Sequence, residues 1–386
     1  MKKIILLLVL AFAMKSITAQ TDTAARLQIS VITCSPGDEL YSIFGHTAIR
    51  VIDSANQTDI IYNYGTFDFD DPNFLVKFTR GKLDYFLSTD EPARFFSSYL
   101  AEKRGITEQV LYLSNTEKRN IQDALIKNLS GNNKYYKYDF LFDNCTTRVR
   151  DILKKYSTIS YTHQLVANGT TFRNMLYVYL DNGGMCWSKL GIDILLGSKI
   201  DKPVTVEQSS FLPDYLMFAV DSFNKKQYFV SSRKEYPVKA SIATGNKYQP
   251  LMVFSTIFLL MLLLSFSKPV ALQKIYHYLS LFFVFVTGVV GCVLLFMWFA
   301  TDHKSCGNNY NLLWALPTNL IFVFLANTKK TFVKQYYKTA TIIAIVLLVC
   351  WFILPQQFNI SLMPFVFTMA LCYKDLFNKI TLVPAK

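Results

Sequence analysis

The chain has 386 residues, 52% of them hydrophobic, and a formal net charge of +13. Most of that charge lies near its two ends, because the first 15 residues hold three lysines and residues 251–386 hold ten lysines and only two acids. The part between them is nearly balanced, so the basic composition does not indicate a nucleic-acid-binding protein. Seven cysteines scattered over this length also exclude a small disulfide scaffold.

The first 19 residues have the pattern of a secretory signal peptide. Lys2 and Lys3 precede an apolar core over residues 4–13, and small residues lead up to Ala19. The alternative is an uncleaved anchor, which Lys15 disfavours. We therefore expect the segment that follows to be exported.

Residues 20–249 are predicted to form an exported α+β domain. Mixed charge, many aromatic residues and no long apolar run are typical of globular material. Alternating runs predict strands, longer periodic stretches predict helices, and the breaks fall at glycine or proline. In chain order these segments are strands at 27–33, 48–52 and 60–64, helices at 92–100 and 116–129, and apolar stretches at 176–180, 192–196 and 211–220.

Cys145 is the candidate nucleophile of this domain. Asn144 is a favourable helix N-cap residue, and residues 146–155 have the apolar spacing of a helix. Cys145 therefore lies in the first helical turn, where unpaired backbone N–H groups and the positive end of the helix dipole favour a thiolate. Arg148 adds positive charge one turn along.

His46 is the candidate base. It follows Gly45 at the beginning of a strand-like run. A cysteine at a helix start that faces a histidine on a strand is the arrangement that thiol acyl transfer needs. The alternative is that Cys145 is a small buried hydrophobic residue without chemistry. Scattered histidines and the lack of a Cys-x-x-Cys pair predict no metal site.

Three further cysteines, Cys34, Cys186 and Cys306, are predicted to lie outside the membrane. Cys34 is the rival nucleophile, but it ends a strand before the Pro36 turn and has no helix start to lower its pKa. At most one disulfide can form among the three, and the sequence does not determine the pair.

Residues 250–386 are predicted to form an all-α transmembrane domain with five spans. The apolar runs cover 251–267, 278–300, 312–326, 339–354 and 358–373. The second run is long enough to cross a bilayer, and the others, of about 15 to 17 residues, are near the lower limit. Five runs in succession after a secretion signal favour spans over soluble core helices. Pro317 and Pro364 predict a kink or a re-entrant segment.

The lysines predict the orientation of these spans. They cluster at 268–274, 329–338 and 374–386, whereas the loops on the other side carry only Lys304. With five spans the three clusters share one side, which the positive-inside rule makes cytoplasmic. We expect the exported domain on the outer side of the membrane and the C-terminus in the cytoplasm.

The outward loop at 301–314 is rich in hydrogen-bonding groups beside the membrane. We expect His303, Asn309 and Asn311 to contact a substrate at the membrane interface, with Trp314 among the lipid headgroups. The alternative is a solvated hairpin with an interfacial tryptophan.

A histidine on a strand followed much later by an Asn-Cys pair at a helix start resembles the circularly permuted NlpC-like proteins, which include relatives of lecithin:retinol acyltransferase. Four longer motifs carry a closer resemblance. They are TCSPGDELYSIFGH at 33–46, YGTFDF at 64–69, YDFLFDNC at 138–145 and FLPD at 211–214. These motifs resemble the Lnb family of bacterial lipoprotein N-acyltransferases.

The resemblance implies a permuted papain-like exported domain in the periplasm and a five-helix membrane domain in the bacterial inner membrane. It also implies acyl transfer at the outer face of that membrane. Cys145 would attack an acyl ester of a membrane phospholipid, and His46 would take the thiol proton. The thioester would then pass its acyl chain to the N-terminal amine of a diacylglyceryl-cysteine lipoprotein, with no cofactor.

Four other residues are assigned auxiliary roles. Asn63 is expected to orient His46, with Asp68 as the competitor. Tyr138 is expected to donate to the oxyanion, together with the N–H groups of the helix start at Asn144–Cys145. The alternative for each is a structural role. Two other functions remain open, a membrane-anchored NlpC-like cysteine peptidase or amidase of the cell wall, and a non-catalytic membrane scaffold.

Overall fold

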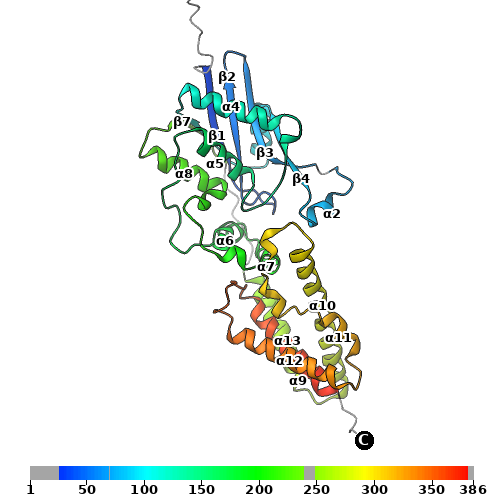
Figure 1. Cartoon of the computed structure of the whole chain (residues 1–386). Helices are drawn as coiled ribbons and strands as arrows, with labels where there is room; N and C mark the ends of the chain where they lie inside the picture. The colour runs from blue at the N-terminus through cyan, green and yellow to red at the C-terminus, as the bar shows by residue number, and fades with distance from the viewer. Residues whose placement is uncertain (1–25, 69, 239–247, 381–386) are drawn as a thin grey trace, which may run out of the picture.

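The computed structural model describes residues 26–68, 70–238 and 248–380. A sheet domain, a pair of short helices and a helical bundle follow one another along the length of the molecule (Figure 1). The predicted signal peptide lies outside the described residues, and so does the segment 239–247 that leads from the sheet domain to the bundle.

The sheet domain is built on a seven-stranded sheet in the described residues, with the order β6-β4-β3-β2-β1-β5-β7. Every neighbouring pair of strands is antiparallel. The three predicted strands are confirmed as the central β1, β2 and β3, whereas β4, β5 and β7 were not predicted. The bounds are β1 (Leu27–Cys34), β2 (His46–Asp53), β3 (Thr58–Thr66), β4 (Asp84–Asp90), β5 (Ile106–Leu111), β6 (Tyr135–Lys137) and β7 (Val230–Tyr236).

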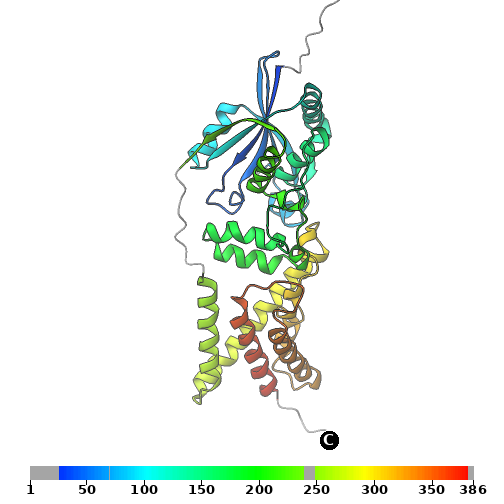
Figure 2. The same ribbon diagram turned by 90° about the vertical axis from the view of Figure 1, so that its left-hand side faces the viewer.

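Helices cover both faces of this sheet (Figure 2). On one face, Val31 and Ile49 pack with Val149 in a core that also takes in side chains of α4 and α8. On the other face, Ala48 packs with Phe95 of α3. Successive strand residues point to opposite faces, so β1 and β2 contribute to both cores. The helices are α3 (Pro92–Ala101), α4 (Asn115–Leu129), α5 (Cys145–Tyr156) and α8 (Pro213–Asn224).

Two short helices, α6 (Phe172–Asn182) and α7 (Cys186–Leu195), form a hairpin between the sheet domain and the bundle (Figure 2). The chain turns between the two helices at Gly183 and Gly184, and Gly184 has a φ of 65°. Leu190 of α7 belongs to the core of the bundle. The remaining short elements are the helix α2 (Phe74–Thr79) and the 3-10 turns at 131–134, 198–201, 208–211, 304–306 and 310–313.

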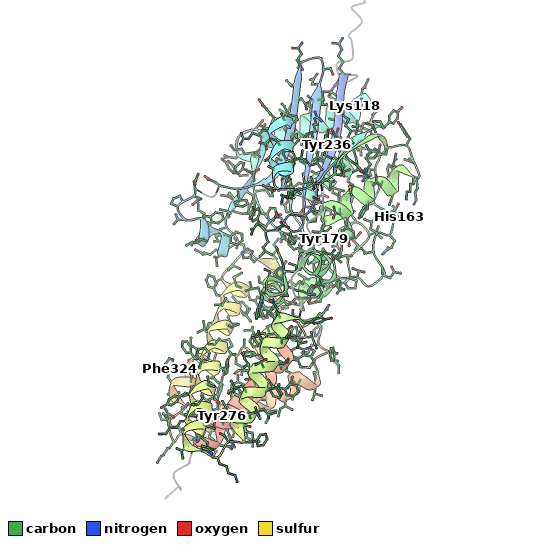
Figure 3. All side chains as sticks on the ribbon, turned by 180° about the vertical axis from the view of Figure 1, so that it is seen from behind. Lys118, His163, Tyr179, Tyr236, Tyr276 and Phe324 are labelled. Carbon is green, nitrogen blue, oxygen red and sulfur yellow. The ribbon has the colours of Figure 1, made fainter. Side chains whose placement is uncertain are left out.

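The described part of the bundle contains five α-helices, which are α9 (Gln249–Ser265), α10 (Val270–Phe299), α11 (Asn319–Leu325), α12 (Thr331–Val349) and α13 (Leu362–Lys379). By length and composition, α10 and α12 can each cross a membrane, and α9 is apolar but shorter. Figure 3 shows Tyr276 of α10 near the end of the bundle that is remote from the sheet domain, and Phe324 of α11 at its margin.

The run at 312–326, where Pro317 predicted a kink or a re-entrant segment, is interrupted, and α11 begins only after Pro317. The preceding backbone lies directly against α10, where a Cβ on Gly291 would come within 2.2 Å of the Ala315 oxygen. The amide of Asn319 is buried and donates to Thr287 Oγ1 at 2.9 Å. Non-helical backbone at membrane depth is tolerated when protein buries it, as it does here.

Candidate active site

The N-cap of α5 holds Cys145 in place. The Oδ1 atom of Asn144 accepts the backbone N–H groups of Thr146 and Thr147, each at 2.8 Å. Its Nδ2 donates to the carbonyl oxygens of Phe140 at 2.7 Å and Phe211 at 3.0 Å. Both hydrogens of the amide are engaged, so Asn144 positions the helix start and has no donor left for an oxyanion.

Cys145 and His46 are brought together where α5 meets the beginning of β2. The thiol and the imidazole form a side-chain hydrogen bond, and the backbone N–H of Thr47 donates to the sulfur. Thr146 Oγ1 lies 3.8 Å from Sγ and 3.0 Å from Thr47 Oγ1, so two threonines join the helix to the strand.

The two groups shift each other's pKa in opposite directions. Burial raises the pKa of Cys145, but the charge and hydrogen bond of His46, with the Thr47 N–H, lower it to about 7. Burial lowers the pKa of His46, yet the neighbouring thiolate outweighs this and the pKa is raised overall. The pair therefore favours a thiolate beside an imidazolium, which is the reactive form of a nucleophilic cysteine.

Asn63 and Asp90 continue the chain of hydrogen bonds behind His46. His46 Nε2 donates to Asn63 Oδ1 at 2.5 Å, and Asn63 Nδ2 lies 3.4 Å from Asp90 Oδ2. Because Nε2 carries the hydrogen, Nδ1 is left to face the thiol. Asp68 is not part of this arrangement, since it is exposed and accepts the N–H of Asp70 in its own loop.

Gly65 opens the space in front of Cys145. It has a φ of 88° next to a break in the β3–β4 register. A Cβ there would lie 3.5 Å from Cys145 Cβ, 3.6 Å from Tyr138 Cε2 and 3.9 Å from the Tyr136 hydroxyl. Tyr136 is 8% exposed, and its hydroxyl has no hydrogen-bond partner among the described residues. Sequence reasoning missed this tyrosine because nothing local marks its hydroxyl as unpaired.

Cys34 lies behind the site and not at its front. It pairs with His46 across β1 and β2, and its side chain is fully buried. Burial raises the pKa of this thiol well above its ordinary value, so Cys34 is a poor nucleophile. Tyr99 of α3 stacks against the imidazole of His46 with 6.1 Å between ring centroids and covers this side of the site.

The predicted lipid contacts of the loop at 301–314 are mostly wrong. Asn311 and Trp314 are buried, and the Trp314 ring nitrogen donates to Asn311 Oδ1 at 2.8 Å. Asn309 is also buried and donates to the carbonyl of Ile194 at 2.8 Å. The last carbonyls of α7 have no partner within the helix, and the side-chain amides of these two asparagines donate to them. Asn309 and Asn311 therefore join the hairpin to the bundle.

His303 differs from the buried residues of this loop, because it faces the sheet domain. Its Nε2 donates to the carbonyl of Phe78 at 3.0 Å. The neighbouring Asp302 N–H donates to the carbonyl of Arg80 at 2.9 Å. The loop therefore ties α2 to the end of α10, and the imidazole is engaged by protein.

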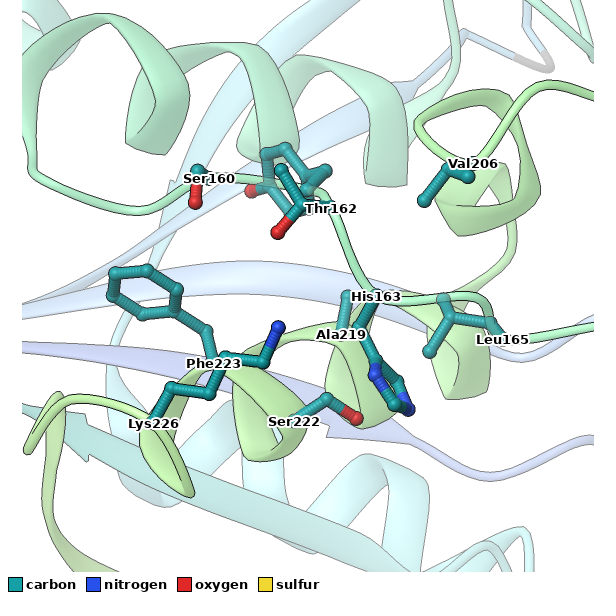
Figure 4. Close-up of a pocket in the computed structure, with 10 residues that line it drawn as sticks. Ser160, Thr162, His163, Leu165, Val206, Ala219, Ser222, Phe223 and Lys226 are labelled. Atoms are coloured by element: carbon teal, nitrogen blue, oxygen red, sulfur yellow. The ribbon is translucent and has the colours of Figure 1, made fainter.

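His163 and the cysteines outside the site offer no second centre. His163 lines a shallow cavity of about 10 Å³ beside Phe223 and Lys226, room for roughly one water (Figure 4). The thiols of Cys186 and Cys306 are free, as are the other five cysteines, all of which the structure describes. Within the described residues no cluster of His, Cys, Asp or Glu could hold a metal ion.

These features define a class of protein, namely an α+β sheet domain that carries a cysteine–histidine site and is joined to a helical membrane bundle. A family model described as the Lnb N-terminal periplasmic domain matches residues 13–177. A second, described as the Lnb transmembrane domain, matches residues 242–381. The chain belongs to the Lnb family and is a membrane protein with a periplasmic domain. The comparisons with curated proteins and with solved structures gave no match.

Proposed function

We propose that this protein is a lipoprotein N-acyltransferase that moves an acyl chain from a membrane phospholipid, through a thioester on Cys145, to the N-terminal amine of a diacylglyceryl-cysteine lipoprotein. The single observation that carries the proposal is the hydrogen-bonded pair of Cys145 and His46 at the start of α5. Membership of the Lnb family and the attached bundle support a lipid substrate.

In the first step, the Cys145 thiolate attacks the ester carbonyl of the phospholipid. We assign the backbone N–H groups of the first turn of α5 and the unpaired Tyr136 hydroxyl as the donors to the developing oxyanion. The ester C–O bond then breaks, and His46 gives its proton to the leaving lysophospholipid oxygen. Tyr136 takes the donor role that the sequence assigned to Tyr138.

In the second step, the amine of the acceptor attacks the thioester carbonyl. His46 is now neutral and accepts the proton that the amine loses, while Asn63 holds the ring in position through Nε2. The C–S bond breaks and the thiolate returns with an amide as the product. A thioester suits this step because a neutral amine attacks it readily, and no cofactor takes part.

We also propose that the bundle crosses the inner membrane five times with its C-terminus in the cytoplasm. Gln249 at the start of α9 accepts a hydrogen bond from Trp187 of α7, and Asn359 before α13 donates to Asp193 of α7. Both helices therefore start at the periplasmic end, and the lysine-rich loops fall at the other end. The permuted papain-like ancestry of the sheet domain and the domain limits 20–249 and 250–386 are part of the same proposal.

The test is the intact mass of the purified full chain after incubation with a diacyl phosphatidylethanolamine. We expect one acyl adduct that hydroxylamine removes and that Cys145→Ala lacks. Addition of a synthetic diacylated lipopeptide should discharge the adduct and yield a triacylated lipopeptide. His46→Ala should slow adduct formation on the order of 10²- to 10⁴-fold, because the base is lost.

Two results would contradict the proposal. A protein that cleaves cell-wall peptides at Cys145 and ignores phospholipid would be a peptidase or amidase. A wild-type chain that forms no adduct with phospholipid, and whose Cys145→Ala variant restores lipoprotein acylation in cells, would be a scaffold.

A further inference from the structure

The short helix α2 (Phe74–Thr79) lies at the periplasmic end of the bundle. The Phe78 and Arg80 carbonyls accept hydrogen bonds from His303 and from the Asp302 N–H, just beyond the end of α10. Figure 1 shows α2 directly above the end of that helix. Since α10 is long and apolar enough to span the bilayer, α2 is at the depth where the outer leaflet begins.

The side chains of α2 are unusually apolar for their exposure. The helix has no buried residue, and Leu75 is 75% and Val76 59% exposed. Exposed Arg80 follows the helix, whereas Lys77 within it pairs with Asp71 at 2.6 Å. An exposed apolar surface next to a basic residue is typical of a segment that lies in a phospholipid headgroup layer.

A continuous series of aromatic rings leads from α2 to the active site. The ring centroids are 5.9 Å apart from Phe78 to Phe74, 5.8 Å from Phe74 to Phe67, 5.1 Å from Phe67 to Tyr85 and 4.3 Å from Tyr85 to Tyr138. Tyr138 lies against the space at Gly65 that faces Cys145. None of the five rings is fully buried, so the series forms an apolar surface from the membrane end to the thiol.

We infer that α2 dips into the outer leaflet of the membrane that the bundle spans, and that the aromatic series from Phe78 to Tyr138 carries the acyl chain of the donor lipid up to Cys145. The inference rests on the proposed function for its second part. It names the occupant of this face as a membrane phospholipid, because the face continues from the periplasmic end of α10 and ends at the nucleophile.

The membrane contact is tested by photocrosslinking of the full chain in vesicles of phosphatidylethanolamine and phosphatidylglycerol. We expect Leu75→p-benzoylphenylalanine to give a phospholipid adduct in the intact mass after illumination. Ile126→p-benzoylphenylalanine is the matched control, since Ile126 is 49% exposed on α4, far from the bundle (Figure 1). Equal lipid adducts at both positions, or none at position 75, would overturn the membrane contact.

The acyl path is tested by the rate of thioester formation. The pair of changes Leu75→Glu and Val76→Glu should slow acylation by vesicle phospholipid on the order of ten-fold or more, because charge disfavours insertion. Alkylation of Cys145 by iodoacetamide should keep its wild-type rate, which shows that the site is intact. Ile126→Glu should change neither rate.

Phe67→Ala tests the aromatic series itself. Acylation by a dipalmitoyl lipid should fall on the order of ten-fold relative to acylation by a dibutyryl lipid, because only the long chain covers the rings. Phe142→Ala is the control, since that half-exposed ring contacts Phe172 instead. Equal slowing with both lipids would overturn the acyl path. If the wild type forms no thioester at all, the proposed function fails, and the crosslinking result still decides the membrane contact.

Discussion

At the scale of single residues, the site depends on how a few polar groups are partnered. The side-chain amide of Asn144 hydrogen-bonds to the helix start and to two carbonyls. The side-chain amide of Asn63 hydrogen-bonds to His46 and Asp90. Tyr136 differs from both, because its hydroxyl is buried and unpaired next to Cys145. A buried polar group without a partner is costly, and the proposed role as an oxyanion donor would explain why this one is there.

Cys145 should titrate near neutral pH. We expect the rate of its alkylation by iodoacetamide to rise with pH around a midpoint of about 7, because the His46 charge opposes the effect of burial on the thiol pKa. His46→Ala removes that charge, so the midpoint should move to higher pH. The pH dependence of adduct formation, read by mass spectrometry with Cys145→Ser to identify the site, checks this. A midpoint near the ordinary thiol value of about 8.5 in the wild type would show that the pair is not coupled.

The Tyr136 hydroxyl should matter for rate and not for stability. Tyr136→Phe removes a buried hydroxyl that has no partner, so the unfolding temperature should stay the same or rise. Thioester formation should fall on the order of 10²-fold, as for the loss of one oxyanion donor. Tyr64→Phe is the matched control, because Tyr64 accepts a hydrogen bond from Asn128 at 2.7 Å and should lose about 1 kcal/mol of stability with no loss of rate. Unchanged acylation by Tyr136→Phe would assign the oxyanion to other donors.

At the scale of elements, local patterns predicted some segments well and others poorly. The strands β1 to β3 and the helices α3 and α4 carry clear periodicity, and α4 also has a capping box between Ser114 and Glu117. The edge strand β7 has only one buried residue, so it lacks the alternation that marks a half-buried strand. The segment at 312–326 has the composition of a membrane helix, but its close approach to Gly288 and Gly291 and the ring of Pro317 interrupt the helix before α11.

At the scale of the whole molecule, a buried polar joint connects the sheet domain to the bundle. Arg173 of α6 is fully buried and pairs with Asp193 at 2.6 Å and Asp201 at 2.7 Å. The other carboxylate oxygen of Asp193 accepts the Asn359 amide of the bundle at 2.8 Å. Asn309 and Asn311 reinforce the same contact. Under the proposed function, the joint would set the height of Cys145 above the membrane, where the lipid substrate is presented.

Loss of Asp193 should loosen this joint. Asp193→Ala leaves the buried Arg173 charge with one partner, so we expect a loss of about 3 kcal/mol of stability, the lower end for a broken buried pair because Asp201 remains. Thermal unfolding of the detergent-solubilised chain measures this. Asp84→Ala breaks an exposed pair with Lys137 and should cost about 0.5 kcal/mol or less. Equal effects of the two changes would show that the joint contributes little.

The sequence by itself determined the class of the chain. Four features define this class, and all are short-range patterns: a signal-like start, an α+β middle, apolar runs with lysines on one side, and a cysteine at a helix start. Each depends on neighbouring residues and on the period of one element. Motifs around His46 and Cys145 also indicated the family, which the comparisons then showed.

Only the tertiary structure decided which groups meet. Residues 46, 63 and 145 come from three elements, and nothing in their spacing shows that Asn63 reaches His46 while Asp68 turns away. Asn311 was expected to contact a substrate at the membrane interface, but it is buried in the protein. The sequence does not show whether a hydrogen-bonding side chain faces lipid or the end of a helix. The partners of a polar group are long-range facts, since they depend on how separate elements pack and not on the order of residues.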